Sequence, residues 1–203
     1  MPTERFPIRD LARIAVFAAV IAVLGLVPPV YLFGGAVPIT AQTLGVMLAG
    51  AVLGPMRGAA SVATLLALVA AGLPLLSGGR GGIGVFLGPT GGYLLGWIFG
   101  ALTVGALLRV GARRPRWWRT ALAALLGGVL VVYAFGVPVQ SLVTGVGLPE
   151  TLLSSLVFVP GDLLKVVLTA VVVRGLWAAY PPAFSWPRPT DRAEPIGAEP
   201  AEA

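Results

Sequence analysis

Two ionisable side chains lie inside an apolar stretch of the sequence, where a membrane would penalise each charge. Asp162 and Lys165 follow Pro160 and Gly161 and are three residues apart, a spacing that places both on one face of a helix. On translocon scales, a charge near the bilayer centre costs about 2.5 to 3.5 kcal/mol, and less towards a helix end. Such a pair persists in lipid only when its members are paired or face a polar cavity.

Two interpretations of this pair follow from its chemistry. In the first, Asp162 stabilises the first turn of the helix and Lys165 neutralises it, so the pair is structural. In the second, the pair belongs to a substrate site, where the carboxylate accepts N–H groups of a ligand and the ammonium meets a ligand carboxylate or is held in place by Asp162. Lys165 is the only lysine in the chain. The pair alone does not decide between these interpretations.

Arg80 is a further candidate because it lies within a glycine-rich segment, residues 73–92. Glycine costs a helix about 1 kcal/mol per residue, so this segment is predicted to be an irregular loop. Irregular backbone at membrane depth must be buried in protein or line a cavity. Arg80 is therefore either an ordinary surface arginine or part of a loop that closes over a ligand. The segment lacks the Gly-Lys-Ser/Thr ending of a P-loop, so its signal for a phosphate site is weak.

The composition indicates that these residues are positioned by membrane-spanning helices. Of the 203 residues, 57% are hydrophobic and 11% are charged, which is too few charges for the surface of a soluble domain of this length. Residues 58–79, 81–108 and 120–149 each contain no charged residue, and each of these stretches exceeds the roughly 20 residues that cross a bilayer.

The same composition argues against several functional classes. The chain has no cysteine, no histidine and only eight acidic residues, so the usual metal-binding and nucleophilic groups cannot be assembled. We expect no enzyme activity, no cofactor and no metal. The net charge of +6 comes from basic residues between apolar runs, which report membrane orientation rather than nucleic-acid binding.

The apolar runs and their breaks predict six transmembrane helices. The prolines at 28 and 29 end the first helix, and Thr40 caps the second. The first run resembles a signal peptide, but no convincing cleavage site follows it, so we interpret it as a spanning helix. The expected helices are residues 14–27, 40–53, 58–72, 93–110, 120–135 and 161–180, with 137–160 as a connector that contains a short helix at 150–158. We expect one domain, 1–180, and a disordered cytoplasmic tail, 181–203.

The arginines test this number of crossings. With six crossings and both termini on one side of the membrane, twelve of the thirteen arginines fall on that side, and only Arg80 falls on the other. This asymmetry is what the positive-inside rule requires, and one helix more or fewer would spoil it. Both termini are therefore predicted to be cytoplasmic.

Small residues recur along the first helix. Ala15 and Ala19 are four residues apart, as are Ala18 and Ala22. Such spacing permits close approach of another transmembrane helix. Packing inside the protein is the alternative explanation, and the spacing alone does not exclude it.

Three strings together resemble the BioY family, the biotin-specific S components of energy-coupling factor (ECF) transporters. They are PITAQTLGVMLAGAVLGPMRGA at 38–59, SGGRGGIGVFLGPTGGYLLGW at 77–97 and VPGDLLK at 159–165. The resemblance implies a six-helix protein that takes up biotin from the outer side. It also implies association with a transmembrane T component and two cytoplasmic ATPases in the plasma (inner) membrane of a prokaryote.

The resemblance also implies roles for particular residues. The G-D-x-x-K motif of the family helps to line the biotin pocket, and its acid and lysine fall on Asp162 and Lys165. The glycine-rich segment with Arg80, and residues 34–42, are expected to close over the pocket. Ala15 and Ala19 resemble the small-residue motif by which S components meet the T component. Further candidates for the pocket lining are Gln42, Thr43, Thr90 and Tyr93.

Two other functions remain open at this point. An S component for another vitamin, such as riboflavin or thiamine, would share the scaffold. An intramembrane enzyme could use Asp162 and Lys165 as acid and base, although nothing else in the sequence resembles a nucleophile or a metal set.

Overall fold

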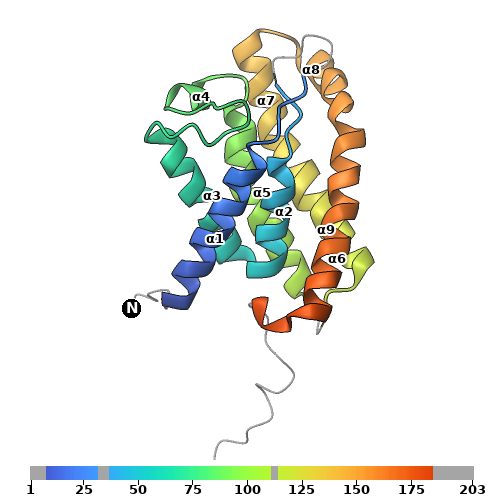
Figure 1. Ribbon diagram of the computed structural model, residues 1–203. Helices are drawn as coiled ribbons and strands as arrows, with labels where there is room; N and C mark the ends of the chain where they lie inside the picture. The colour runs from blue at the N-terminus through green and yellow to red at the C-terminus, as the bar shows by residue number, and fades with distance from the viewer. Residues whose placement is uncertain (1–7, 32–36, 111–113, 185–203) are drawn as a thin grey trace, which may run out of the picture.

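The protein is helical over the residues that the computed structural model describes, which are 8–31, 37–110 and 114–184 (Figure 1). Within these residues, β-type pairing is limited to two isolated bridges, Val30 with Ile39 and Leu76 with Arg80. The predicted all-α class is confirmed.

Nine α-helices make up most of the described chain. They are α1 Ile8–Leu24, α2 Gln42–Leu53, α3 Pro55–Ala70, α4 Gly84–Leu87, α5 Gly91–Arg109, α6 Trp117–Leu125, α7 Val132–Thr144, α8 Leu148–Ser155 and α9 Val159–Ala179. A π-helical segment, η1 Leu126–Val131, joins α6 to α7. A 3-10 segment, η2 Leu156–Phe158, joins α8 to α9, and a second one, η3 Pro181–Ala183, follows α9.

Within the described residues, three helical runs are long and apolar enough to cross a bilayer, which needs about 20 residues. They are Gly91–Arg109, with 19 residues, Trp117–Thr144, with 28, and Leu148–Ala179, with 32. Large apolar side chains are exposed along them, such as Leu142, Leu164 and Val171. These exposed apolar surfaces are typical of a protein that is solvated by lipid. Shorter apolar helices, α2 and α3, complete the bundle.

The α5 helix lies at the centre and packs against α2, α3 and α7. Glycines permit this packing. A Cβ atom at Gly50 on α2 would collide with the carbonyl oxygen of Ala101 and would lie 3.0 Å from Cβ of Val104, both on α5. The α1 and α9 helices lie on opposite flanks of the bundle (Figure 1), where α1 packs against α2 and α3, and α9 packs against α2 and α6.

The first turn of α1 and the end of α9 lie at the same end of the bundle, and α4 and α8 lie at the other (Figure 1). At the first end, Asp10 forms an ion pair with Arg57 at 2.7 Å. Arg13 donates a hydrogen bond to the carbonyl of Pro182 at 2.9 Å. Polar contacts therefore join α1 to α3 and to the segment that follows α9.

Several predicted helix boundaries were wrong. The α1 helix is already formed at Ile8, the first described residue of this segment, six residues before the predicted start, and its Asp10 pairs with Arg57. It ends at Leu24, before the prolines at 28 and 29, where the Ile21 carbonyl bonds to a side chain of α2. Thr40 does not cap α2, whose N-cap position is Ala41. The α3 helix begins at Pro55 rather than at residue 58, because proline fits the first turn of a helix.

The largest boundary errors concern residues 136–160. The fifth helix was expected to end at residue 135, but it continues through Pro138 to Thr144 and ends where Gly145 adopts a φ of 71°. Membrane helices tolerate proline in their interior, so the glycine is the stop signal here. The expected connector is instead the end of α7 followed by a continuous run of α8, η2 and α9.

The expected tail also begins later than predicted. Residues 181–183 form η3, and the Phe184 ring is buried against Trp177, with the ring centroids 5.0 Å apart. This aromatic contact anchors the chain as far as Phe184. The rest of the expected tail, 185–203, lies outside the described residues.

The contact between α2 and α5 is testable at Gly50. We expect Gly50→Ala to lower the free energy of unfolding by about 1 to 3 kcal/mol, because the added methyl group overpacks the helix contact. Gly175→Ala on α9 is the matched control, since a Cβ atom there meets nothing within 4 Å. Thermal unfolding in detergent measures both variants, and an equal effect of the two would contradict the packing described.

Candidate ligand-binding site

A pocket of about 600 Å³, its mouth included, lies between α2, α5, α7 and α9. Its lining combines polar, charged and aromatic residues of the helices with residues of two loops. The lining residues are Val37, Pro38, Ile39, Thr40, Gln42, Thr43, Leu76, Arg80, Thr90, Tyr93, Leu94, Trp97, Gly128, Val132, Tyr133, Phe158, Asp162 and Lys165. All seven residues predicted for a substrate site therefore lie around one pocket.

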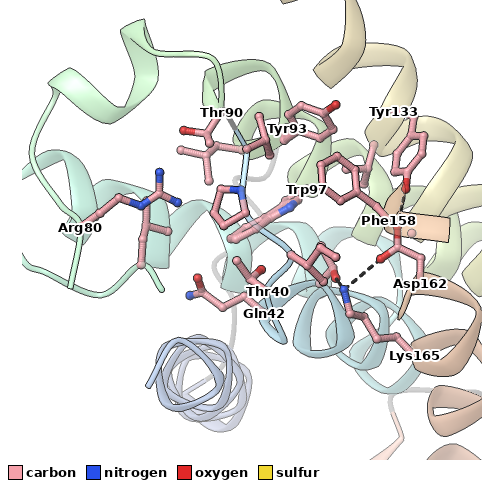
Figure 2. Close-up of a pocket in the computed structure, with 18 residues that line it drawn as sticks. Thr40, Gln42, Arg80, Thr90, Tyr93, Trp97, Tyr133, Phe158, Asp162 and Lys165 are labelled. Carbon is pink, nitrogen blue, oxygen red and sulfur yellow. Dashed lines mark hydrogen bonds and ion pairs between the residues drawn. The ribbon is translucent and has the colours of Figure 1, made fainter. Parts of the chain in front are cut away.

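Asp162 and Lys165 form an ion pair at one end of this pocket, with Nζ and Oδ1 2.9 Å apart (Figure 2). Their side chains are only 9% and 12% exposed. Lys165 also donates to Oγ1 of Thr43 on α2 at 3.0 Å. The Tyr133 hydroxyl on α7 donates to Oδ2 of Asp162 at 2.6 Å. Side chains from three helices therefore compensate the buried charges.

The sequence of α9 explains why this pair faces the pocket. Asp162 is buried on the inner face, and Lys165 lies three residues further along the same face. Leu163 and Leu164, between them, are 47% and 60% exposed and lie on the outer side of the bundle. The spacing of three residues thus separates a polar inner face from an apolar outer face.

Aromatic side chains form a wall of the pocket. Tyr93 and Trp97 lie one turn apart on α5, and Tyr93 packs edge-on against Tyr133, with the centroids 6.3 Å apart. The Tyr93 hydroxyl donates to Oε1 of Gln140 at 2.8 Å and lies 3.3 Å from Oγ of Ser155. Because these contacts engage the hydroxyl, what Tyr93 offers the pocket is its ring.

Arg80 lies at the opposite end of the pocket from Asp162 and Lys165, with Trp97 between them (Figure 2). Its Nε donates to the Ser77 carbonyl at 3.2 Å. Gly78 and Gly79 form the intervening turn with φ values of 80° and 69°, which favour glycine. No carboxylate of the described residues forms an ion pair with Arg80.

Two of the predicted lining residues use their polar atoms on the protein backbone. Nε2 of Gln42 donates to the carbonyls of Ile21 and Leu75, and its Oε1 accepts from the Ser77 N–H. Oγ1 of Thr90 donates to the Val85 carbonyl at 3.3 Å. Residues 34–36 of the loop that was expected to cover the pocket lie outside the described residues.

The sequence analysis did not identify Trp97, Tyr133 and Phe158 as lining residues. Trp97 could have been found, because Thr90, Tyr93 and Trp97 repeat at helical spacing on one face. The sequence indicates a lining role for Tyr133 less clearly, through a phenol in an otherwise apolar run. Nothing in the sequence indicates such a role for Phe158, because its position depends on the 3-10 turn before α9.

Ala15 and Ala19 are not among the lining residues and are exposed on α1, whereas Ile14, Ala18 and Ile21 are buried. Packing inside the described part of the protein therefore does not account for these two alanines. Among the described residues, no group of three or more acidic, histidine or cysteine side chains could hold a metal ion.

The fold and the pocket define a helical membrane protein that encloses a site for a small polar molecule. The chain belongs to the BioY family, whose model matches residues 1–182.

Its relatives cover almost the whole fold. The chain is 48% identical to the biotin transporter BioY of Rhizobium etli, over 85% of this chain and 95% of that protein. It is 47% identical to the biotin transporter BioY of Rhodobacter capsulatus, over 86% and 96%. Among solved structures it resembles the S-component for biotin from an ECF-type ABC transporter, with a TM-score of 0.79 and 38% identity over 84% of this chain and 92% of that one.

The hydrogen bond from Tyr133 to Asp162 predicts a stability difference between two tyrosines. Tyr133→Phe removes a donor to a buried carboxylate and should lower the free energy of unfolding by about 1.5 to 3 kcal/mol. Tyr180→Phe is the control, because Tyr180 is 60% exposed. Thermal unfolding in detergent should separate the two, and equal stability would show that this hydrogen bond contributes nothing.

Proposed function

We propose that this chain binds biotin and acts as the substrate-capture (S) component of an ECF-type vitamin uptake transporter. The observation that carries the proposal is the pocket with the Asp162 and Lys165 pair, in a chain that is 48% identical to a named biotin transporter. The solved neighbour, an S-component for biotin, supports the same conclusion. These names favour biotin over riboflavin or thiamine, and transport over enzymatic turnover.

The chemistry of the pocket complements that of biotin. Biotin offers two ureido N–H donors, a ureido oxygen, an apolar thioether ring and a carboxylate. The pocket supplies an anion, two cations and aromatic walls, which are the few placed polar groups and large apolar area typical of ligand sites.

The distribution of charge suggests an orientation for the ligand. At one end, Lys165 is already neutralised by Asp162 at 2.9 Å, so this end suits the uncharged ureido ring, whose N–H groups can reach Asp162. At the other end, Arg80 pairs with no carboxylate of the described residues. We therefore assign the biotin carboxylate to Arg80 and the thioether ring to the wall near Trp97.

The membrane arrangement follows from the same proposal. Six crossings would be made by α1, α2, α3, α5, the run from α6 to α7 and the run from α8 to α9. Both termini would be cytoplasmic in a prokaryotic plasma membrane, because this places the arginines of α1, α3 and the loop before α6 on the inner side. The pocket would then open outward, with the glycine-rich loop closing over it.

The energy for uptake would come from partner subunits. The sequence contains no P-loop, so ATP hydrolysis is assigned to two cytoplasmic ATPases coupled through a transmembrane T component. The exposed face of α1 with Ala15 and Ala19 is the proposed contact with the T component, because small side chains allow close helix approach.

Calorimetry on the purified chain in detergent tests the ligand directly. We expect saturable biotin binding, and no binding of riboflavin or thiamine at the same concentrations. Binding of either of these vitamins without biotin binding would identify a different substrate and refute the proposal.

The charged pair should be required for this binding. Asp162→Asn or Lys165→Ala should weaken biotin binding by about 10- to 100-fold, because each leaves a buried partner without its counter-charge or hydrogen bond. Arg174→Ala is the control, since Arg174 is an exposed cation on the same helix. Wild-type affinity in both pocket variants, with the fold retained, would remove the pair from the site.

The α1 face should be required for assembly but not for binding. Ala15→Leu combined with Ala19→Leu should abolish co-purification with the T component, because the larger side chains prevent close helix contact. Biotin affinity should be unchanged. Val167→Leu with Val171→Leu is the control, since these residues have the same spacing and are exposed on α9, on the opposite flank. Normal assembly of the alanine variant would place the T component elsewhere.

A further inference from the structure

Gln42 lines the pocket, yet its amide points away from Asp162 and Lys165 (Figure 2). The side chain is 1% exposed. Nε2 donates to the Ile21 carbonyl of α1 at 3.2 Å and to the Leu75 carbonyl at 3.1 Å. Oε1 accepts from the Ser77 N–H at 2.9 Å. Both N–H donors of the amide are thus committed to backbone, and neither is left for a ligand.

Ser77 connects Gln42 to Arg80. It is fully buried, and each of its polar groups has a partner. Its N–H donates to Gln42, its hydroxyl donates to the Val27 carbonyl at 2.9 Å, and its carbonyl accepts from Nε of Arg80 at 3.2 Å. Ser77, whose carbonyl accepts from the Arg80 side chain, is therefore held by α2 through its N–H and by the chain that follows α1 through its hydroxyl.

The turn between Ser77 and Arg80 is closed by two reciprocal backbone hydrogen bonds, Leu76 N–H to Arg80 O at 3.0 Å and Arg80 N–H to Leu76 O at 3.2 Å. The junction is also tightly packed. A Cβ atom at Gly25 would lie 2.6 Å from the Leu75 carbonyl oxygen and 2.9 Å from Nε2 of Gln42. The turn can therefore move relative to α1 and α2 only if these buried hydrogen bonds break.

We infer that Gln42 and Ser77 are positioning residues, which fix the Arg80 guanidinium over the pocket and make no contact with the ligand themselves. The inference rests on the proposed function, in which Arg80 receives the ligand carboxylate. Gln42 was predicted to line the pocket and contact the ligand. In this inference it instead holds in place the turn that carries Arg80. Because Ile21 and Val27 belong to α1 and the chain after it, the same hydrogen bonds tie the position of Arg80 to that helix.

A double-mutant cycle tests whether Gln42 acts through Arg80. Gln42→Glu keeps the shape and one acceptor but directs an oxygen at the Ile21 and Leu75 carbonyls. It should weaken biotin binding by about 10- to 100-fold, because the loosened turn no longer holds Arg80 in place to bond to the ligand carboxylate. Arg80→Ala should weaken binding similarly. The double variant should bind biotin no more than about twofold more weakly than Arg80→Ala alone. In a second double variant, Gln42→Glu with Lys165→Ala, the two fold-losses in biotin affinity should multiply, because these residues act at different ends of the pocket.

Multiplicative losses for Gln42→Glu and Arg80→Ala would overturn the inference, because a direct ligand contact or a general loss of folding predicts them. Wild-type binding by Arg80→Ala would overturn it too. Ser77→Ala supplies a second variant and should weaken biotin binding by about 2- to 10-fold. Its control is Ser61→Ala, since Ser61 is equally buried but bonds within its own helix, to the Arg57 carbonyl.

Amide hydrogen exchange separates this inference from the proposed function, because it needs no ligand. Gln42→Glu should raise the exchange rate of the Leu76, Ser77 and Arg80 amides about 10-fold or more over wild type, and Ser61→Ala should not. Unchanged protection of these amides would show that Gln42 does not hold the turn. If Gln42→Glu exchanges faster but the wild-type chain binds no biotin, the role of Gln42 in holding the turn is supported and the proposed ligand is refuted.

Discussion

A buried ammonium group and a buried carboxylate in a membrane protein each need a counter-charge or hydrogen-bond partners. The arrangement of three helices around Asp162 and Lys165 provides them. The pair on α9 would be costly if it faced lipid. Instead, Thr43 of α2 and Tyr133 of α7 bond to Lys165 and Asp162, respectively. Three helices are thus brought together around two charges, and the space beside them is the pocket. The site and the stability of the fold therefore depend on the same hydrogen bonds.

At the opposite end of the pocket, the backbone of an irregular loop imposes a second constraint, because its N–H and C=O groups need hydrogen-bond partners. Such backbone persists at membrane depth only when its polar groups are satisfied by protein. Gln42 and Ser77 provide this for the turn that carries Arg80, through buried bonds to α1 and the chain after it. One end of the pocket therefore carries the paired charges of Asp162 and Lys165 on a helix. The other end carries Arg80, on a turn that buried hydrogen bonds hold in place.

The sequence predicts those features of the structure that depend on residues close together in the chain, and it misses those that depend on contacts between distant residues. Uncharged stretches, the spacing of Asp162 and Lys165, and the isolation of Arg80 are local features, and they predicted the helical class and these three residues of the pocket. The other four, Gln42, Thr43, Thr90 and Tyr93, were implied only by the resemblance to the BioY family. Non-local features were missed. Pro138 was expected to lie outside a helix, but the neighbouring turns of a long membrane helix accommodate it. The partners of Gln42 lie 21 to 35 residues away in sequence, so its role could not be inferred from its type.

A structure of the chain with biotin bound tests the central claim most directly. The account predicts biotin in this pocket, with its ureido N–H groups within hydrogen-bonding distance of Asp162, its thioether ring against Trp97 and its carboxylate on the Arg80 guanidinium. Biotin bound outside the pocket, or inside it with neither the Asp162 and Lys165 pair nor Arg80 in contact, would contradict the account.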